Sequence, residues 1–230
     1  MKDFLQRNKV FIIVILATCI LIVGGLFLMS RGSNPSTVSS TNVDSSILAP
    51  SGVYKTSGLV NGFYLPASPS ATVTLVEFGD YVCPACGDAA PYVKQVLTDF
   101  PGKVNYVFRN YPLSYHTNAP LASYAAEAAG LQGKYFEMND RLYSTQNDWS
   151  NLPDPASVFV GYAKDLGLNT DKFTSDMNSQ NVKDVVQRDM NDGKTVALTE
   201  TPTFYINGTK VSLSGDSNQL RDLIQVDLAK

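Results

Sequence analysis

The sequence predicts a mixed α/β domain with a long helical insertion, preceded by one membrane-spanning helix. Three observations lead to this fold class. An uncharged apolar segment covers residues 10–29 near the N-terminus. A strand–helix–strand pattern follows in residues 73–113, and a strand hairpin followed by a helix ends the chain. Residues 114–199, between these two patterns, have helical periodicity.

Residues 10–29 are long enough to be a membrane anchor. At ~1.5 Å per residue, a helix of this length spans a ~30 Å hydrocarbon core. Lysine and arginine are concentrated in residues 1–9, so we expect that segment to be cytoplasmic and the rest of the chain to lie outside. Cleavage as a signal peptide or lipoprotein is the alternative, but a signal peptide has a shorter apolar region, ~7–15 residues. Within an anchor, Cys19 is simply a small apolar residue.

Residues 30–50 are rich in Ser, Thr and Asn, which predicts a flexible linker; an ordered strand starting near Ile47 is the alternative. Residues 51–230 are then one globular domain on the outer face of a membrane, where disulfides persist. The net charge of −3 and the scattered lysines form no basic stripe, which argues against a nucleic-acid partner.

The first part of the domain contains a strand, a helix and a second strand. Residues 73–78 are apolar and mostly β-branched, as in a strand buried on both faces. Apolar residues then recur every three or four positions from Ala85 to Leu97, and Pro84 suits the first helical turn. Residues 103–113 supply the second strand, so the two strands are expected to be parallel.

Helical stripes follow within residues 119–146, broken near Gly133, and continue to about residue 190. Residues 202–213 read as a hairpin with an Asn207–Gly208 turn. Residues 216–229 finish the chain as an amphipathic helix.

Two of the three cysteines, Cys83 and Cys86, stand three positions apart at the predicted start of the first helix. Residues i and i+3 share a helix face, near enough for a disulfide. The helix N-terminus favours the thiolate of Cys83, which is thus the expected nucleophile, with Cys86 resolving the mixed disulfide. A structural zinc site needs four ligands, whereas this region offers the two thiols and His116. Two thiolates could still hold Cu(I), and a purely structural disulfide is the third option.

The segments VEFGDYVCPACGDAAP and RNYPLSYHTNAPLASYAAEAAGLQGKYFEMNDRLY resemble the DsbA-like branch of the thioredoxin superfamily, particularly its membrane-tethered extracytoplasmic members. The resemblance covers about residues 65–229. It implies a thioredoxin fold with an inserted helical subdomain at about residues 114–199, and disulfide exchange on exported proteins.

The resemblance implies roles for individual residues. Cys83 matches the exposed nucleophile and Cys86 the buried resolving thiol. Pro202 matches a proline whose preceding peptide bond is cis, although an ordinary strand-start proline is the alternative. Thr201 and Pro202, together with Pro84–Ala85 between the cysteines, are then expected to contact substrate.

Glu77 matches a buried acid beneath the active site, where it could exchange a proton with the resolving thiol; an edge-facing glutamate is the alternative. Asp80 and Tyr81 are expected to shape the loop before the helix. Ala85 has no donor for the thiolate, whereas the strongest oxidases of the family have histidine there. His116 has no assigned role, and we expect a solvated loop histidine.

These observations predict a membrane-anchored thiol–disulfide oxidoreductase that oxidises cysteines of exported proteins and needs no soluble cofactor. The resemblance implies a quinone-linked membrane partner that reoxidises it. A reductase or isomerase using the same site remains open, as does an anchored Cu(I)-binding protein.

Overall fold

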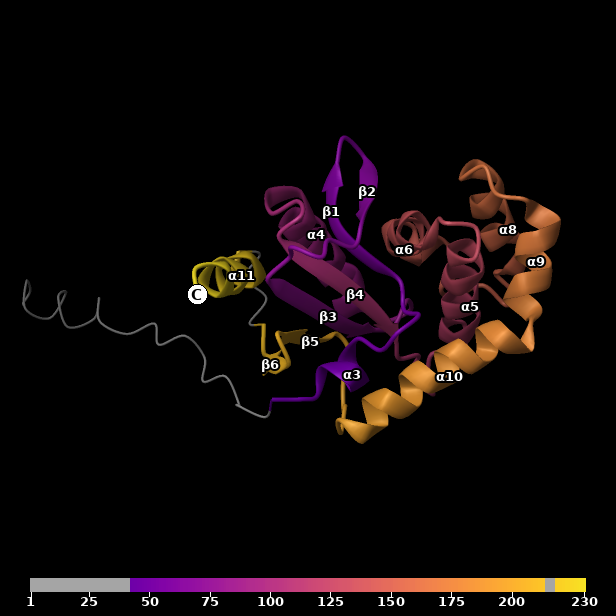
Figure 1. Ribbon diagram of the computed structural model, residues 1–230. Coiled ribbons are helices and arrows are strands. Elements are labelled where there is room, and N and C mark those ends of the chain that lie inside the picture. Colours follow the sequence, from indigo (N-terminus) through magenta and orange to yellow (C-terminus); the bar gives the residue numbers. More distant parts are fainter. Residues whose placement is uncertain (1–41, 214–217) are drawn as a thin grey trace, which may run out of the picture. The chain divides into compact units, whose positions relative to one another are not determined.

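A six-stranded sheet forms the centre of the domain (Figure 1). The computed structural model describes residues 42–213 and 218–230. The strand order is β2-β1-β4-β3-β5-β6. The strands are β1 Lys55–Val60, β2 Phe63–Pro66, β3 Val73–Gly79, β4 Val104–Asn110, β5 Thr203–Ile206 and β6 Thr209–Val211.

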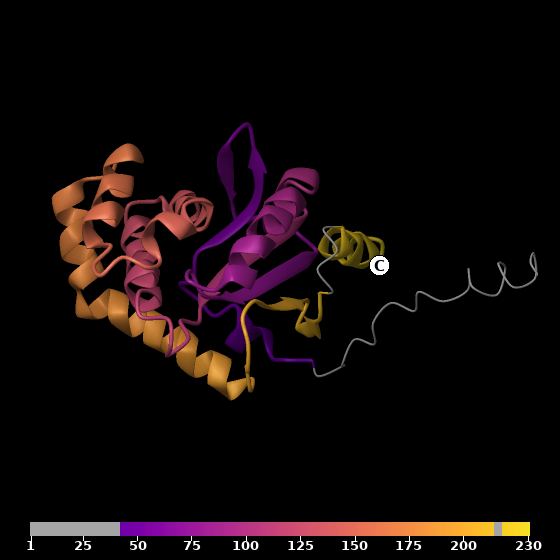
Figure 2. The ribbon, with the colours of Figure 1, turned by 180° about the vertical axis from the view of Figure 1, so that it is seen from behind.

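The predicted strand–helix–strand unit is confirmed. β3 and β4 pair in parallel from Val73 opposite Val104 to Gly79 opposite Asn110. Six of the seven residues of β3 are buried, because helices or loops cover both faces of the sheet. The helix α4 (Pro84–Asp99) connects the two strands and crosses one face of the sheet (Figure 2). Both strands therefore end at the same edge, where α4 begins.

The helical insertion lies between β4 and β5, as predicted, and forms a separate block beside the sheet (Figure 1). Its helices are α5 Ala119–Gly130, α6 Tyr135–Ser144, α7 Gln146–Trp149, α8 Ala156–Asp165, α9 Thr170–Asn178 and α10 Gln180–Thr195. The break near Gly133 is confirmed, since this glycine has a φ of 77° between α5 and α6. The predicted hairpin β5–β6 and the terminal helix α11 (Gln219–Leu228) are also present.

The β1–β2 hairpin was not predicted, although its signal is in the sequence. Asn61 and Gly62 occupy a two-residue turn between the strands, with φ values of 51° and 82°. Asn-Gly tolerates such left-handed conformations and is typical of tight hairpins. This hairpin extends the sheet on one side of β4 through antiparallel pairing of β1.

The linker predicted for residues 30–50 is wrong for residues 42–50, which belong to the folded domain. Val43 N–H donates to the Gly208 carbonyl at 2.8 Å, and Asp44 caps the short helix α3 (Ser45–Leu48). Leu48 is buried beneath the sheet because it packs into a core cluster with strand residues. The predicted cytoplasmic segment 1–9, the anchor 10–29 and the linker as far as residue 41 lie outside the described residues. Within the described part, no helix is long and apolar enough to cross a membrane.

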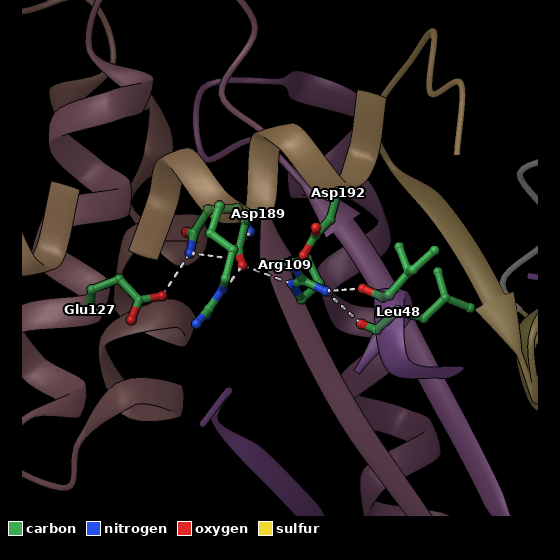
Figure 3. Close-up of polar contacts among 8 residues, drawn as sticks. Leu48, Arg109, Glu127, Asp189 and Asp192 are labelled. Carbon is green, nitrogen blue, oxygen red and sulfur yellow. Dashed lines mark hydrogen bonds and ion pairs between the residues drawn. The ribbon is translucent and has the colours of Figure 1, made fainter. Parts of the chain in front are cut away.

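Arg109 on β4 ties α3 to the helical insertion (Figure 3). Its side chain is fully buried, and its Nε donates to Asp189 on α10 at 2.9 Å. Nη2 pairs with Asp192, and Nη1 donates to the carbonyls of Ile47 and Leu48 at 2.6 and 2.9 Å. A buried guanidinium is tolerated only when paired and hydrogen-bonded in this way. The strand, the N-terminal segment and the insertion are thus held by one side chain.

Glu127 on α5 extends this buried network. Asn110 Nδ2 donates to Glu127 Oε1 at 2.7 Å and to Asp189 Oδ2 at 3.2 Å (Figure 3). Burial raises the pKa of Glu127 to about 8, and the nearby charge of Asp189 adds to the effect. Glu127 is therefore mainly protonated at neutral pH, which avoids a further negative charge beside Asp189 and Asp192.

We predict that Glu127→Gln stabilises the protein increasingly as the pH rises from 5 to 8. The pKa of Glu127 is about 8 when folded and ~4.3 when unfolded. The folded protein holds the proton more tightly, so the parent loses about 1.4 kcal/mol of unfolding free energy per pH unit between these values. Glutamine keeps the oxygen that accepts from Asn110 and does not titrate. Urea unfolding of both proteins at several pH values tests this; a constant difference from pH 5 to 8 would contradict it.

Candidate active site

Cys83 lies at the N-terminus of α4, directly after the loop that follows β3. It is the N-cap residue, with extended backbone angles, and Pro84 occupies the first helical position. This is the predicted placement, because a proline is tolerated where the helix has no partner for its N–H groups. Cys86 lies one turn further into the helix and is completely buried. Cys83 retains 7% exposure, so it is the more accessible residue of the two.

The two sulfurs have different surroundings. Both cysteines are free thiols in the structure. Cys83 Sγ lies 3.3 Å from the Thr201 carbonyl oxygen, across the site from α4. The Thr201–Pro202 peptide bond is cis, as the resemblance implies. On the inner side, the Asp80 N–H donates to Cys86 Sγ at 3.5 Å.

This asymmetry separates the acidities of the two thiols. The pKa of Cys83 is lowered to about 5, chiefly by the hydrogen bond from the Cys86 thiol and also by the N–H groups of Cys86 and Ala85, although burial opposes the shift. The pKa of Cys86 is raised far above its usual value, first by burial and then by its bond to Cys83. At neutral pH, Cys83 is therefore the thiolate and Cys86 the thiol.

Glu77 lies on β3 within the sheet and is buried, so the edge-facing alternative is wrong. Tyr106 donates its hydroxyl to Glu77 Oε2 at 2.7 Å, while Oε1 has no protein partner. Burial raises the pKa of Glu77 to about 7. Its charge is one of the causes that raise the pKa of Cys86, so the two groups lie near enough to influence each other. A group with this pKa can hold or release a proton at neutral pH.

His116 is not a solvated loop histidine, contrary to the sequence-based expectation. Its side chain is 16% exposed, and its Nδ1 lies 2.8 Å from Oδ2 of the fully buried Asp80. Asp80 shapes the loop before the helix, as predicted, because its Oδ1 accepts from the N–H groups of Val82 and Cys83. Tyr81 packs in the same region, against Phe108 and Tyr143.

Gln146 is a site residue that sequence reasoning missed. It belongs to α7 in the insertion, and its Nε2 donates to the carbonyls of Tyr81 and Cys83 at 2.8 and 3.0 Å. No motif marks it, because an amide reaching a backbone carbonyl far away in the sequence leaves no local pattern. The insertion thus fastens the active-site loop directly.

A hollow of about 620 Å³ lies beside the cysteine helix, although neither Cys83 nor Cys86 lines it. It lies between α4 and the segment around the cis peptide bond. Of the residues expected to contact substrate, Ala85, Thr201 and Pro202 line it, whereas Pro84 is exposed but not part of the lining. Tyr92 and Phe204 add aromatic surface. Among the described residues, no three His, Cys, Asp or Glu side chains are grouped so that they could hold a metal ion.

The sequence matches the family described as thioredoxin over residues 67–226. The chain belongs to this family. Its fold is similar to three solved structures. Oxidised BdbD from Bacillus subtilis has a TM-score of 0.62 at 23% identity, covering 71% of this chain and 91% of BdbD. The thiol-disulfide exchange protein α-DsbA2 from Wolbachia pipientis has a TM-score of 0.65 at 19% identity, covering 79% and 90%. A thioredoxin-like oxidoreductase from Silicibacter pomeroyi DSS-3 has a TM-score of 0.58 at 26% identity, covering 71% and 91%.

Curated relatives match over a segment only. The Na(+)/H(+) antiporter NhaA 1 of Salinispora arenicola is 39% identical over 141 residues, which is 61% of this chain and 21% of the antiporter. The protein of the same name from Mycobacterium sp. strain KMS is 36% identical over 152 residues, or 64% and 24%. The chain therefore spans about a fifth to a quarter of the length of these relatives.

The family match and the fold confirm the expected thioredoxin fold with its helical insertion. What the domain does depends on the geometry of this site.

Proposed function

We propose that the protein oxidises cysteines of exported proteins through a Cys83–Cys86 disulfide. The observation that carries the proposal is the asymmetry of the pair: the pKa of Cys83 is lowered to about 5 and that of Cys86 is raised. A thiolate that is stable in the reduced state favours reduction of the disulfide, and hence oxidation of the substrate. The absence of a side-chain donor at Ala85 keeps a reductase or isomerase role as the alternative within the same chemistry.

The first step is attack on the disulfide. A substrate thiolate attacks Sγ of Cys83, the more accessible residue of the two, and a substrate–Cys83 bond replaces the Cys83–Cys86 bond. Cys86 leaves as a thiolate in a buried site where its negative charge is disfavoured, so it must receive a proton. Protonated Glu77 supplies this proton, directly or through water, and its pKa of about 7 suits the task.

The second step releases the product. A second thiolate of the substrate attacks the substrate sulfur of the mixed disulfide, and Cys83 leaves as its stable thiolate. The substrate has then lost two electrons and holds a disulfide. The protein has gained these electrons, and Cys83 and Cys86 are both reduced. In the bound complex, Thr201 and Pro202 flank the substrate segment from the side opposite α4.

Regeneration requires an oxidant that takes two electrons from the reduced pair. We assign this task to a quinone-linked membrane partner. Residues 10–29 would anchor the chain with residues 1–9 in the cytoplasm and the catalytic domain outside. Release of the full-length protein from membranes by alkaline carbonate would contradict the anchor.

Replacement of each cysteine in turn tests which sulfur is the nucleophile and which resolves the mixed disulfide. In Cys86→Ala no thiol of the protein can attack a substrate–Cys83 disulfide, so a client peptide with a single cysteine should remain bound. We expect Cys86→Ala, activated as a mixed disulfide with glutathione, to exchange glutathione for this client at Cys83, whereas Cys83→Ala takes up no client. Non-reducing mass spectrometry of both variants distinguishes the outcomes. Trapping through Cys86 in the Cys83→Ala protein would contradict the assigned roles.

Glu77→Gln tests proton delivery to Cys86. Glutamine keeps an acceptor for Tyr106 but has no proton to give. We expect the first step to slow by about 10²-fold at pH 6. In the parent, this rate should decline as the pH rises through about 7, after correction for ionisation of the attacking thiol, because Glu77 loses its proton. The variant should lack this decline. Stopped-flow reduction of the disulfide measures both rates, and identical pH profiles would contradict the relay.

A further inference from the structure

The Asp80 carboxylate connects the active-site loop to the loop that follows β4. It is completely buried and accepts four hydrogen bonds. Oδ1 accepts from the N–H groups of Val82 and Cys83 at 2.7 and 3.3 Å. Oδ2 accepts from Leu113 N–H at 2.7 Å and faces His116 Nδ1 at 2.8 Å. A buried carboxylate depends on such donors, since burial removes its water.

His116 provides the side-chain donor of this set. A carboxylate only accepts hydrogen bonds, so Nδ1 of His116 carries the shared proton. The segment of His116 is held independently of this bond, because Tyr111 N–H donates to the Gly79 carbonyl at 2.8 Å and Leu113 N–H donates to Asp80. Loss of the imidazole would therefore remove one donor from Asp80 without releasing the whole loop.

Asp80 also touches both cysteines through its main chain. Its carbonyl accepts from Cys83 N–H at 3.1 Å, and its N–H donates to Cys86 Sγ at 3.5 Å. Asp80 thereby holds Cys83, the N-cap residue of α4, and the N–H groups of the first turn help to hold the thiolate. A displacement of Asp80, or an uncompensated charge on it, would therefore change the surroundings of the Cys83 sulfur.

We propose that His116 is a positioning residue for disulfide exchange, acting through Asp80 to hold Cys83 in place at the start of α4. Its Nδ1–H donates to the Asp80 carboxylate and helps to fix the residue that holds the N-cap of the cysteine helix. Its partner is the Asp80 carboxylate and not a sulfur, so its effect is indirect. The proposal requires Cys83 to be the reactive thiol, as proposed above, but holds for either direction of exchange.

Two substitutions of His116 distinguish the loss of its hydrogen-bond donor from a change in side-chain volume. Asparagine can place its Nδ2–H near the position of the imidazole Nδ1–H, whereas leucine fills similar space without a donor. The pH dependence of Cys83 alkylation by iodoacetamide, followed by mass spectrometry of the reduced protein, reports its ionisation. We expect His116→Leu to raise the pKa of Cys83 by about one unit, a roughly tenfold loss of thiolate below that pKa. His116→Asn should titrate like the parent.

Asn169→Ala is the control for effects of a general loss of stability. Asn169 caps α9 in the insertion through a 2.8 Å bond to Lys172 N–H and has no contact with the cysteine loop. Its removal should cost about 1 kcal/mol of unfolding free energy and leave the Cys83 titration unchanged. The proposal fails if His116→Leu titrates like the parent, or if His116→Asn and His116→Leu shift the pKa equally. Failure of the parent to oxidise any client, with these titrations as expected, would overturn the proposed function and not the role of His116.

Discussion

The hydrogen bond from the Cys86 thiol to the Cys83 sulfur is the interaction on which the chemistry of this domain depends. It is the largest of the causes that lower the pKa of Cys83, and the same bond raises the pKa of Cys86. One contact thus produces a nucleophile and a resolving thiol from two identical side chains. It requires the two sulfurs to lie on one helical turn, with the outer sulfur at the helix N-terminus, where main-chain N–H groups also favour negative charge.

The rest of the fold maintains this geometry from several directions. β3 delivers Asp80 to the loop, the segment after β4 contributes His116, and α7 contributes Gln146. Thr201 approaches from the start of β5. The helical insertion is therefore part of the active-site framework. Arg109 fastens that insertion to β4 and to the N-terminal segment, which makes residues 42–50 a structural part of the same unit.

Local patterns were sufficient to predict the strands β3 and β4, the cysteine helix, the hairpin near the C-terminus and the cysteine pair itself. Each depends on residues that are near one another in the sequence. The burial of Glu77 was expected from the family resemblance and not from a local pattern. The β1–β2 turn carried a signal in Asn61–Gly62 that was not used.

The remaining features depend on contacts distant in sequence. Composition indicated a linker up to residue 50. Leu48 is nevertheless buried, because its side chain packs against strand residues and its carbonyl accepts from Arg109. His116 and Gln146 reach the active-site loop across 36 and 65 residues, and no spacing rule connects such positions. Sequence periodicity therefore described the elements, whereas the side chains that hold the loop emerged only from the folded arrangement.

The reduction potential of the Cys83–Cys86 pair tests the central claim most directly, because it measures how strongly the domain stabilises the reduced pair. Equilibration of the protein with glutathione redox buffers at pH 7 measures it. A thiolate held at the helix N-terminus predicts a value well above the roughly −270 mV of thioredoxin. A value at or below that level would show that the thiolate is not stabilised, and would reverse the direction of electron flow.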